Sequence, residues 1–527
     1  MLGTSKPYFP GWRPEWSGRS PVIAEEGMVA TSQPLATEAA IHCLREGGNA
    51  VDAALTAAAV LTVVEPMSTS FGGDLFAQVY WARTDELKGF NASGCAPEAA
   101  TLEDFHDRGY TELMPERGIL SATVPGAFAG FCLLQETYGS FSLSDILEPA
   151  CRLARHGFPV SPIIAREWVE KEELLQAQTA AATHYLRGGK APRAGEKFTI
   201  PAIAETLGYL ARSGRDGFYR GSVAEAFVKL SDEQEGLFQL RDFSSFQPEE
   251  VSPLSAEYRG AEVFELPPNG QGLTVLLMLR LLEPIALESM GFQDELTLHY
   301  LIESTKLAYQ VRNRFIADPA FAEVPINTLL GDENIEELRG RLDPERCFAP
   351  VAAADTPSGQ DTVYLSVVDR DRNCVSLIQS LFHSFGSGLV AGNTGILLHN
   401  RAHGFSLVPD HPNALAPGKR PFHTLIPGMA FSDGEPLLSF GVMGGHHQPQ
   451  GHLQFLTNIL CFAQDVQSAL DAPRFHYEDP HVYLEPGLPQ RTAEGLRRRG
   501  HHIEAPERNR CGGGQAIREI LIRIQFG

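Results

Sequence analysis

The chain has 527 residues, of which 43% are hydrophobic and 20% are charged, and its formal net charge is -22 at pH 7. This composition excludes a disordered chain, and the length allows two or more domains or one large body with a substantial core. The excess of acidic residues excludes nucleic acid as an expected partner, because phosphate binding depends on clustered Lys and Arg.

Residues 1–26 form a proline-rich lead-in without the apolar core of a secretory signal. The longest apolar stretch, Ala53 to Val64, is alanine-rich and too short to span a bilayer comfortably. The eight cysteines show neither CxxC pairs nor the density of a disulfide scaffold, so we expect them to be reduced. These features predict a cytoplasmic protein with no membrane partner.

The first third of the chain predicts a strand and helices around two glycine turns. After Gly27 we expect a short strand and then two helices, separated by Gly47-Gly48. The glycine turn at Gly72-Gly73 leads into a strand of alternating character. Residues 102–254 are expected to be largely helical, with one helix starting at Ser144.

The middle of the chain repeats this alternation. The run AEVFELPPNGQG predicts a strand from Ala261 that ends in a loop at Pro267 to Gly272, and an apolar helix follows. Helices are expected to about Arg346. Residues 348–360 are rich in Ala, Pro, Gly and Ser, and we expect a mobile segment there.

From Asp361 onward the pattern becomes rich in strands, and one helix is expected at residues 452–472. The combination of strand runs with helices indicates a layered α/β body with an antiparallel sheet core. The expected strands are TVYLSVVD, CVSLIQSLF, GILLHN, GMAFSD and PLLSFGVMGG.

The dipeptide Asp361-Thr362 opens the first of these strands and is a candidate cleavage site. Cutting the bond before Thr362 would give one residue both a hydroxyl nucleophile and an α-amine that acts as its base. Such an amine titrates at roughly 7.7–8.0, so a useful fraction is neutral at physiological pH. A threonine at a strand start is more often only a β-branched strand residue, so the surrounding sequence must decide.

That surrounding sequence resembles the γ-glutamyltranspeptidases, which are N-terminal-nucleophile hydrolases that cleave themselves before a threonine. The matching blocks run in order from Gly27 to the C-terminus and are GMVAT, LREGGNAVDAA, FGGDLF, ATVPGAFAGF, CRLARHGF, YRGAEVFELPPNGQG, DTVYLSVVD, GKRPFHTLIPG and GVMGGHH. The resemblance implies a four-layer αββα fold with stacked antiparallel sheets. It also implies a large subunit, residues 27–361 after the lead-in, and a small catalytic subunit, residues 362–527, intertwined in one body.

The resemblance assigns catalytic roles to four residues. Thr362 falls on the nucleophile, and Ser380 falls on a second hydroxyl that supports it. Gly444 and Gly445 fall on the pair whose backbone amides bind the oxyanion, where glycine allows the backbone to come close to the reacting carbonyl. The alternatives are an ordinary strand serine at position 380 and a tight turn at the glycine pair.

The residues that bind substrate in the family differ here. Ser93 stands at the position of the arginine that holds the α-carboxylate, Gly404 at that of the acidic residue for the α-amino group, and Phe382 at that of a nearby asparagine. Because serine lacks the bidentate fork of arginine, a free γ-glutamyl group should bind poorly. Arg401 is a candidate replacement cation, with a surface arginine as the alternative, and we expect His423 and Thr424 to line the acyl pocket.

The sequence predicts no cofactor and no metal, because the histidines lack ligand spacing such as HExxH. The pattern is most similar to a transpeptidase-like branch and to cephalosporin-acylase-like relatives. We therefore expect a small-molecule amide substrate, either γ-glutamyl or another, dicarboxylic, acyl group. A non-catalytic member with a binding role and a homodimer of processed heterodimers are further alternatives.

Overall fold

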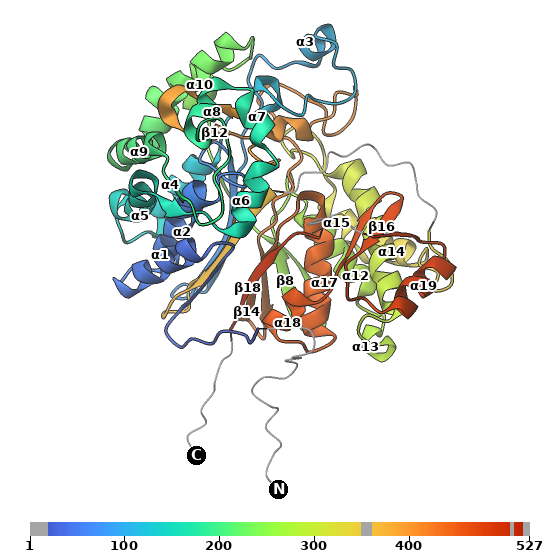
Figure 1. Cartoon of the computed structure of the whole chain (residues 1–527). Helices are drawn as coiled ribbons and strands as arrows, with labels where there is room; N and C mark the ends of the chain where they lie inside the picture. Colours follow the sequence, from blue (N-terminus) through green and yellow to red (C-terminus); the bar gives the residue numbers. More distant parts are fainter. Residues whose placement is uncertain (1–18, 349–360, 506–510, 520–527) are drawn as a thin grey trace.

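The structure is a computed structural model that describes residues 19–348, 361–505 and 511–519. Most of the predicted lead-in and of the predicted mobile segment therefore lie outside the described residues. Figure 1 shows two central sheets between two outer layers of helices, one blue to green and the other yellow to red. This arrangement confirms the predicted four-layer αββα fold with stacked antiparallel sheets.

The first central sheet has six strands in the order β1-β9-β10-β2-β3-β6, all paired antiparallel. Its central strands β9 and β10 follow residue 361, whereas their neighbours β1 and β2 come from the first 81 residues. The strands are β1 (Met28–Thr31), β2 (Asp74–Trp81), β3 (Glu86–Ala92), β6 (Glu249–Val251), β9 (Asp361–Val368) and β10 (Cys374–Phe382).

The second central sheet has five antiparallel strands in the order β18-β14-β13-β8-β7. It too combines strands from both sides of the bond between residues 361 and 362. The strands are β7 (Leu254–Tyr258), β8 (Ala261–Glu265), β13 (Gly428–Ser432), β14 (Glu435–Val442) and β18 (Gly514–Arg518).

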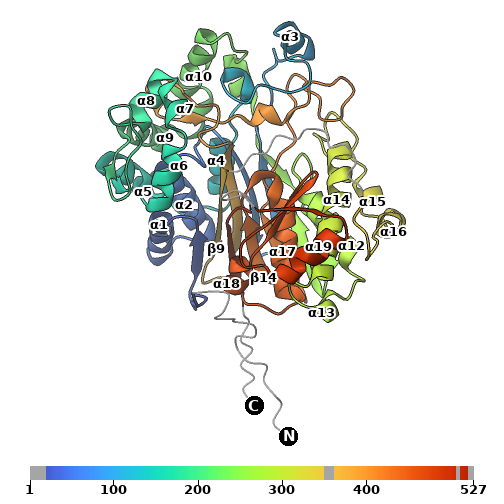
Figure 2. The same cartoon turned by 45° about the vertical axis from the view of Figure 1, so that its right-hand side comes forward.

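The two sheets meet face to face where β9 lies beside β14 (Figure 2). The Ser366 hydroxyl of β9 donates to Ser439 Oγ of β14 at 2.7 Å. The Tyr364 ring fills the space above Gly441, where an added Cβ would lie 2.3 Å from a ring carbon. Glycine is needed at position 441 because only a missing side chain leaves room for this ring.

The helices of the first outer layer cover the six-stranded sheet, because α2 packs on β9 and β10 and α4 packs on β2 and β3. The fully buried helix α2 starts at Asn49, whose side chain and that of Asp52 form a capping box. The helices before β7 are α1 (Pro34–Arg45), α2 (Ala50–Val64), α3 (Leu102–Asp107), α4 (Ala127–Tyr138), α5 (Leu143–His156), α6 (Pro162–Val169), α7 (Glu172–Gln176), α8 (Thr179–Tyr185), α9 (Pro201–Tyr219), α10 (Ser222–Glu233) and α11 (Leu240–Ser245).

The second outer layer covers the five-stranded sheet, where α12 packs on β7 and β8 and α17 packs on β14. Apolar side chains of α12 are buried between that sheet and α14. The helices after β8 are α12 (Gly272–Leu282), α13 (Leu287–Met290), α14 (Glu295–Phe315), α15 (Ile326–Leu329), α16 (Asp332–Arg339), α17 (Gln448–Leu460), α18 (Val466–Asp471) and α19 (Gln490–Arg498).

Short elements complete the described part of the chain. The remaining strands form three small sheets away from the two large ones. These strands are β4 (Phe158–Pro159), β5 (Lys197–Phe198), β11 (Leu389–Val390), β12 (Leu397–Leu398), β15 (Phe475–Glu478), β16 (His481–Leu484) and β17 (His502–Glu504). The 3₁₀ turns are η1 (Ile119–Ser121), η2 (Gly392–Thr394), η3 (Arg401–Gly404) and η4 (Gly445–His447).

Two sequence predictions about helices were wrong. The helix predicted at residues 452–472 is two helices, because Ala463 takes a left-handed φ of 50° and the Asp465 side chain caps the start of α18. The helix predicted to start at Ser144 starts after Ser142, whose side chain bonds the backbone of Asp145. Within the described ranges, no helix combines the length and apolarity needed to cross a bilayer.

Candidate active site

The predicted nucleophile and its supporting hydroxyl lie on adjacent strands. The Thr362 hydroxyl donates to Ser380 Oγ at 3.2 Å, and Thr362 is only 5% exposed. The regular pairing of β9 with β10 is interrupted between Gln379 and Phe382, which sets Ser380 apart from the ladder. The Phe382 N–H also donates to Ser380 Oγ at 2.8 Å. Ser380 therefore holds both the Thr362 hydroxyl and the backbone at Phe382.

The glycine turn before β2 packs against this strand end. An added Cβ at Gly73 would lie 2.3 Å from the Ser380 carbonyl oxygen, and one at Gly72 would lie 2.0 Å from that of Leu397. Both glycines are therefore required by close backbone contact. This close packing places the next residue, Asp74, in the interior beside Ser380, with which it is paired in the register of β2 and β10.

Three side chains surround the fully buried Asp74 carboxylate, whose Oδ1 also accepts from the Gly94 N–H at 2.9 Å. His399 Nδ1 and His423 Nε2 each lie 3.1 Å from Asp74 Oδ2, and Arg401 Nε lies 3.5 Å from it. Burial alone would raise the pKa of Asp74, but the contacts with the two histidines bring it below its ordinary value. Asp74 is therefore ionised and anchors the other three side chains.

His423 is held as a neutral ring. Burial, together with the nearby Arg401 charge, lowers the pKa of His423 to about 3. Its Nδ1 accepts a hydrogen bond from the Leu425 N–H at 3.2 Å, so its Nε2 carries the proton that it donates to Asp74. The His423 ring thus fills space in the site, and its one N–H donor is already bonded to Asp74.

Arg401 is completely buried, so the interpretation as a surface arginine was wrong. Its Nη1 donates to Thr424 Oγ1 at 3.0 Å, and its guanidinium carbon lies 4.1 Å from the centroid of the Phe382 ring. Burial lowers the pKa of Arg401 to about 10, so the side chain keeps its charge at neutral pH. Among the described residues its Nη2 has no hydrogen-bond partner, and a buried donor of this kind calls for an acceptor.

The glycine pair lies just beyond the end of β14. Gly444 has φ 120° and Gly445 has φ 57°, backbone conformations that a residue with a side chain rarely adopts. The pair starts η4, which leads directly into α17. This geometry fits a tight turn, and the oxyanion role of its backbone amides stays a prediction.

Two of the altered family positions are closely packed. Ser93 is fully buried, its hydroxyl donates to Asn91 Oδ1 at 2.7 Å, and its carbonyl accepts from Arg420 Nε at 3.1 Å. An added Cβ at Gly404 would lie 3.0 Å from the Phe422 carbonyl oxygen. Thr362, Ser380 and Phe382 are thus brought together, as are Arg401, His423 and Thr424. Ser93 bonds to Asn91 and to Asn269, and the Asn269 carbonyl accepts from the His423 N–H.

Asp74 and His399 are functional candidates that sequence reasoning did not single out as site residues. The two lie far apart in sequence, and neither belongs to a spaced motif with the other. The available signal was the FGGDLF block itself, since an acidic residue at the start of a strand with a buried pattern needs a partner.

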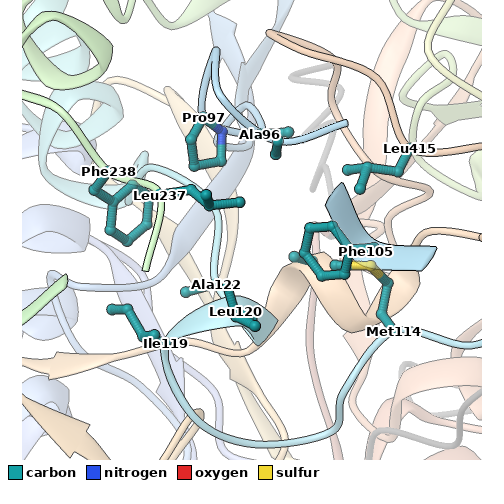
Figure 3. Close-up of a pocket in the computed structure, with 12 residues that line it drawn as sticks. Ala96, Pro97, Phe105, Met114, Ile119, Leu120, Ala122, Leu237, Phe238 and Leu415 are labelled. Carbon is teal, nitrogen blue, oxygen red and sulfur yellow. The ribbon is translucent and has the colours of Figure 1, made fainter. Parts of the chain in front are cut away.

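A small apolar cavity, drawn in Figure 3, is lined in part by Ala402 of η3. Its volume is about 10 Å³, and its lining includes Phe105, Met114 and Leu415, together with Ala402, the neighbour of Arg401. An apolar cavity of that size holds about one water-sized molecule at most. It is therefore too small and too apolar to be the substrate site.

A second polar cluster lies far from Thr362 in the sequence and contains His299, Glu303 and His501. His299 Nδ1 and His501 Nε2 are in hydrogen-bond contact at 2.8 Å, and the Lys306 ammonium lies 2.8 Å from Glu303 Oε1. An ammonium group beside the carboxylate takes the place that a divalent cation would need. We assign this cluster to the binding of α14 to the C-terminal segment.

The chain was compared with known proteins. The family model for Gamma-glutamyltranspeptidase matches residues 36–520. The glutathione hydrolase-like YwrD proenzyme of Bacillus subtilis is 36% identical over 490 residues, 92% of each chain, and the oxamate amidohydrolase proenzyme of Klebsiella pneumoniae is 33% identical over 494 residues, again 92% of each. A cephalosporin acylase structure from Bacillus halodurans superimposes with a TM-score of 0.90 at 39% identity, covering 99% of this chain and 95% of the other.

Proposed function

This chain belongs to the γ-glutamyltranspeptidase family and is a self-processing amidase of that kind, and we propose that its substrate is a small amide whose acyl group carries a carboxylate. The observation that carries the proposal is the buried, charged Arg401 with an unfilled donor beside Thr424. We propose Thr362 as the nucleophile, with Asp361-Thr362 as the cleavage site.

Processing begins when the Thr362 hydroxyl attacks the carbonyl carbon of Asp361. The C–N bond breaks, the nitrogen of Thr362 becomes a free amine, and an ester joins the two residues. Water then hydrolyses the ester. The products are a large chain that ends in the Asp361 carboxylate and a small chain that begins with Thr362.

Turnover uses the amine that processing releases. The α-amine of Thr362 accepts the hydroxyl proton, the oxygen attacks the substrate carbonyl, and the Gly444 and Gly445 amides stabilise the oxyanion. The proton is passed to the leaving amine as the C–N bond breaks. The acyl-enzyme is resolved by water or by an amine acceptor, while Ser380 keeps the Thr362 oxygen in place.

The proposed carboxylate subsite contains Arg401 and Thr424. Within the described part of the chain Arg401 Nη2 has no hydrogen-bond partner, and because Thr424 Oγ1 accepts from Nη1, the Thr424 O–H is directed elsewhere as a second donor. Two donors on a charged and a polar group suit one carboxylate. Asp74 holds Arg401 by its Nε and so leaves the outer edge of the guanidinium for substrate.

The α-amino contacts of a γ-glutamyl group have been replaced by an apolar and a missing side chain. Phe382 presents its ring to Arg401, and Gly404 has no side chain to accept from an amine. A deaminated dicarboxylic acyl group avoids burying an unpaired ammonium. The relative named oxamate amidohydrolase, whose named substrate is an amide with a free carboxylate, supports this choice.

The test is a comparison of three anilides with mature enzyme. Glutaryl-, γ-glutamyl- and butyryl-p-nitroanilide share the leaving group and differ in the carboxylate and the α-amino group. We expect kcat/KM to be highest for the glutaryl compound, and Thr424→Val to lower that value while leaving the butyryl value nearly unchanged. Preference for γ-glutamyl over glutaryl would contradict the proposal.

Two further predictions about the molecule in its cell rest on the sequence. We propose a cytoplasmic location and a homodimer of processed heterodimers. Cell fractionation and the molar mass of the processed enzyme in solution test them separately.

A further inference from the structure

One buried amide side chain bonds to both halves of the proposed site. Gln271, in the PPNGQG loop before α12, is completely buried. Its Nε2 donates to the Thr424 carbonyl at 2.9 Å and to the Gly445 carbonyl at 3.0 Å. Thr424 belongs to the carboxylate subsite and Gly445 to the oxyanion turn, so a single side chain spans the two.

Arg312 of α14 fixes the orientation of this amide. Arg312 Nη1 donates to Gln271 Oε1 at 3.1 Å, so Nε2 must be the end that faces the two carbonyls. Arg312 is itself 2% exposed, and its Nε donates to Asn313 Oδ1 at 2.9 Å. Its guanidinium carbon lies 3.9 Å from the centroid of the Tyr309 ring, which stabilises the buried charge.

The oxyanion turn is held at each of its three carbonyls. The Gly444 carbonyl accepts from the His447 N–H at 2.9 Å within the turn, and the Gly445 carbonyl accepts from Gln271. The His446 carbonyl accepts from the Tyr309 hydroxyl. The Gly445 carbonyl also accepts from the Gln448 N–H. Two side chains from outside the turn, Gln271 and Tyr309, therefore hold it as well, and Arg312 contacts both of them.

The same loop holds the carboxylate subsite by its backbone. The Asn269 carbonyl accepts from the His423 N–H at 2.9 Å, and Asn269 Nδ2 donates to the Pro421 carbonyl at 2.7 Å. Together with the Gln271 bond to Thr424, the PPNGQG loop makes three hydrogen bonds to residues 421–424. The subsite cannot shift against the oxyanion turn without breaking a buried hydrogen bond.

We propose that Gln271, oriented by Arg312, is a positioning residue that sets the separation between the carboxylate subsite and the oxyanion amides. The proposal rests on the proposed function of that same site. A substrate anchored by its carboxylate has its reacting carbonyl aligned only while this separation is fixed. Gln271 therefore determines how far binding of the substrate carboxylate raises kcat/KM.

This role predicts a loss of selectivity as well as of rate. In Gln271→Met the side-chain length is kept and both donated hydrogen bonds are lost. We expect kcat/KM for glutaryl-p-nitroanilide to fall by about 10-fold to 100-fold, because misplacement of about 1 Å can cost about 100-fold. The butyryl compound has no carboxylate to anchor it, so its kcat/KM should fall less and the ratio between the two should shrink.

Gln454 supplies a matched control. It is buried too, and its Nε2 also donates to two carbonyls, those of Gln450 at 2.9 Å and Phe475 at 3.0 Å. Gln454→Met removes an equivalent pair of bonds outside the site. It should lower the melting temperature to a similar extent while leaving the glutaryl-to-butyryl ratio unchanged.

Gln271→Glu provides a second variant should the methionine form fail to fold. It keeps the shape and the Arg312 contact but places an oxygen against the two carbonyls. An unchanged ratio in both Gln271 variants, with kcat on the best substrate equal to that of Gln454→Met, overturns the positioning role. If the wild-type enzyme prefers the butyryl over the glutaryl anilide, the proposed substrate is overturned instead. In that case, comparing kcat on the butyryl compound between the Gln271 variants and Gln454→Met still decides the role of Gln271.

Discussion

Removing Arg401 should destabilise the protein through the carboxylate that it leaves behind. In Arg401→Met the buried Asp74 keeps two histidine partners but loses the cation whose Nε lies 3.5 Å from its Oδ2. With an effective dielectric constant of about 20, unit charges at that distance attract by about 5 kcal/mol. Since breaking a buried pair by removing one partner costs about 3–5 kcal/mol, we expect a loss in that range in the free energy of unfolding.

A double-mutant cycle separates this effect from lost packing. Asp74→Asn keeps the shape of the carboxylate and removes its charge, so the double variant has neither an unpaired anion nor an unpaired cation. We expect the double variant to be more stable than the sum of the single losses by about 2–3 kcal/mol. Urea denaturation of the four processed proteins at one pH measures the cycle.

The pH dependence gives an independent check on the same pair. The pKa of Asp74 is lowered in the folded protein, so its contribution is present above its unfolded pKa of about 3.9 and is lost as pH falls through the folded value. Without Arg401 the folded pKa of Asp74 should be higher, so that loss should be smaller and complete at a higher pH. A cycle that is additive within about 0.5 kcal/mol, with unchanged pH dependence, would refute the charge-pair reasoning.

Three further predictions concern processing, support of the nucleophile and pH. Thr362→Ala should remain a single chain of 527 residues on a denaturing gel. Wild type should yield a small chain whose mass matches a fragment that begins at Thr362. An uncut wild type would contradict this prediction. Ser380→Ala removes the acceptor of the Thr362 hydroxyl and should lower kcat by about 10-fold, whereas Ser380→Thr should retain most of it, as steady-state rates will show. The pKa values of His383 and His423 are lowered to about 3 in the folded protein. The free energy of unfolding should therefore keep their full contribution above the unfolded pKa of about 6.5 and lose it as the pH falls towards 3. A melting temperature that stays constant between these two pH values would exclude this prediction.

The layered fold was predictable because its signals are local. Alternating apolar residues and glycine turns identify β2, β9 and β14 directly, and the Pro267–Gly272 loop marks the entry to α12. The errors arose where one polar side chain interrupts an apolar run. Asp465 caps α18 within a stretch whose periodicity continues through the break, so pattern alone joins two helices.

The candidate site was only half predictable. Thr362 and Ser380 were paired by the family resemblance, and they lie on adjacent strands joined by one short turn. The Asp74 cluster joins residues from opposite ends of the chain, and no periodicity relates a glycine turn to His399 or His423. The burial of Arg401 likewise follows from tertiary packing, since its own sequence neighbours are polar and small.

The pairing at the start of β9 bears on the timing of activation. In the uncut chain Asp361 stands in register with Phe382, the residue whose ring contacts Arg401. Cleavage at the proposed bond would therefore leave the new carboxyl terminus of the large chain close to Phe382. We expect that terminus to compete with substrate, so that activity lags behind cleavage in a time course of processing.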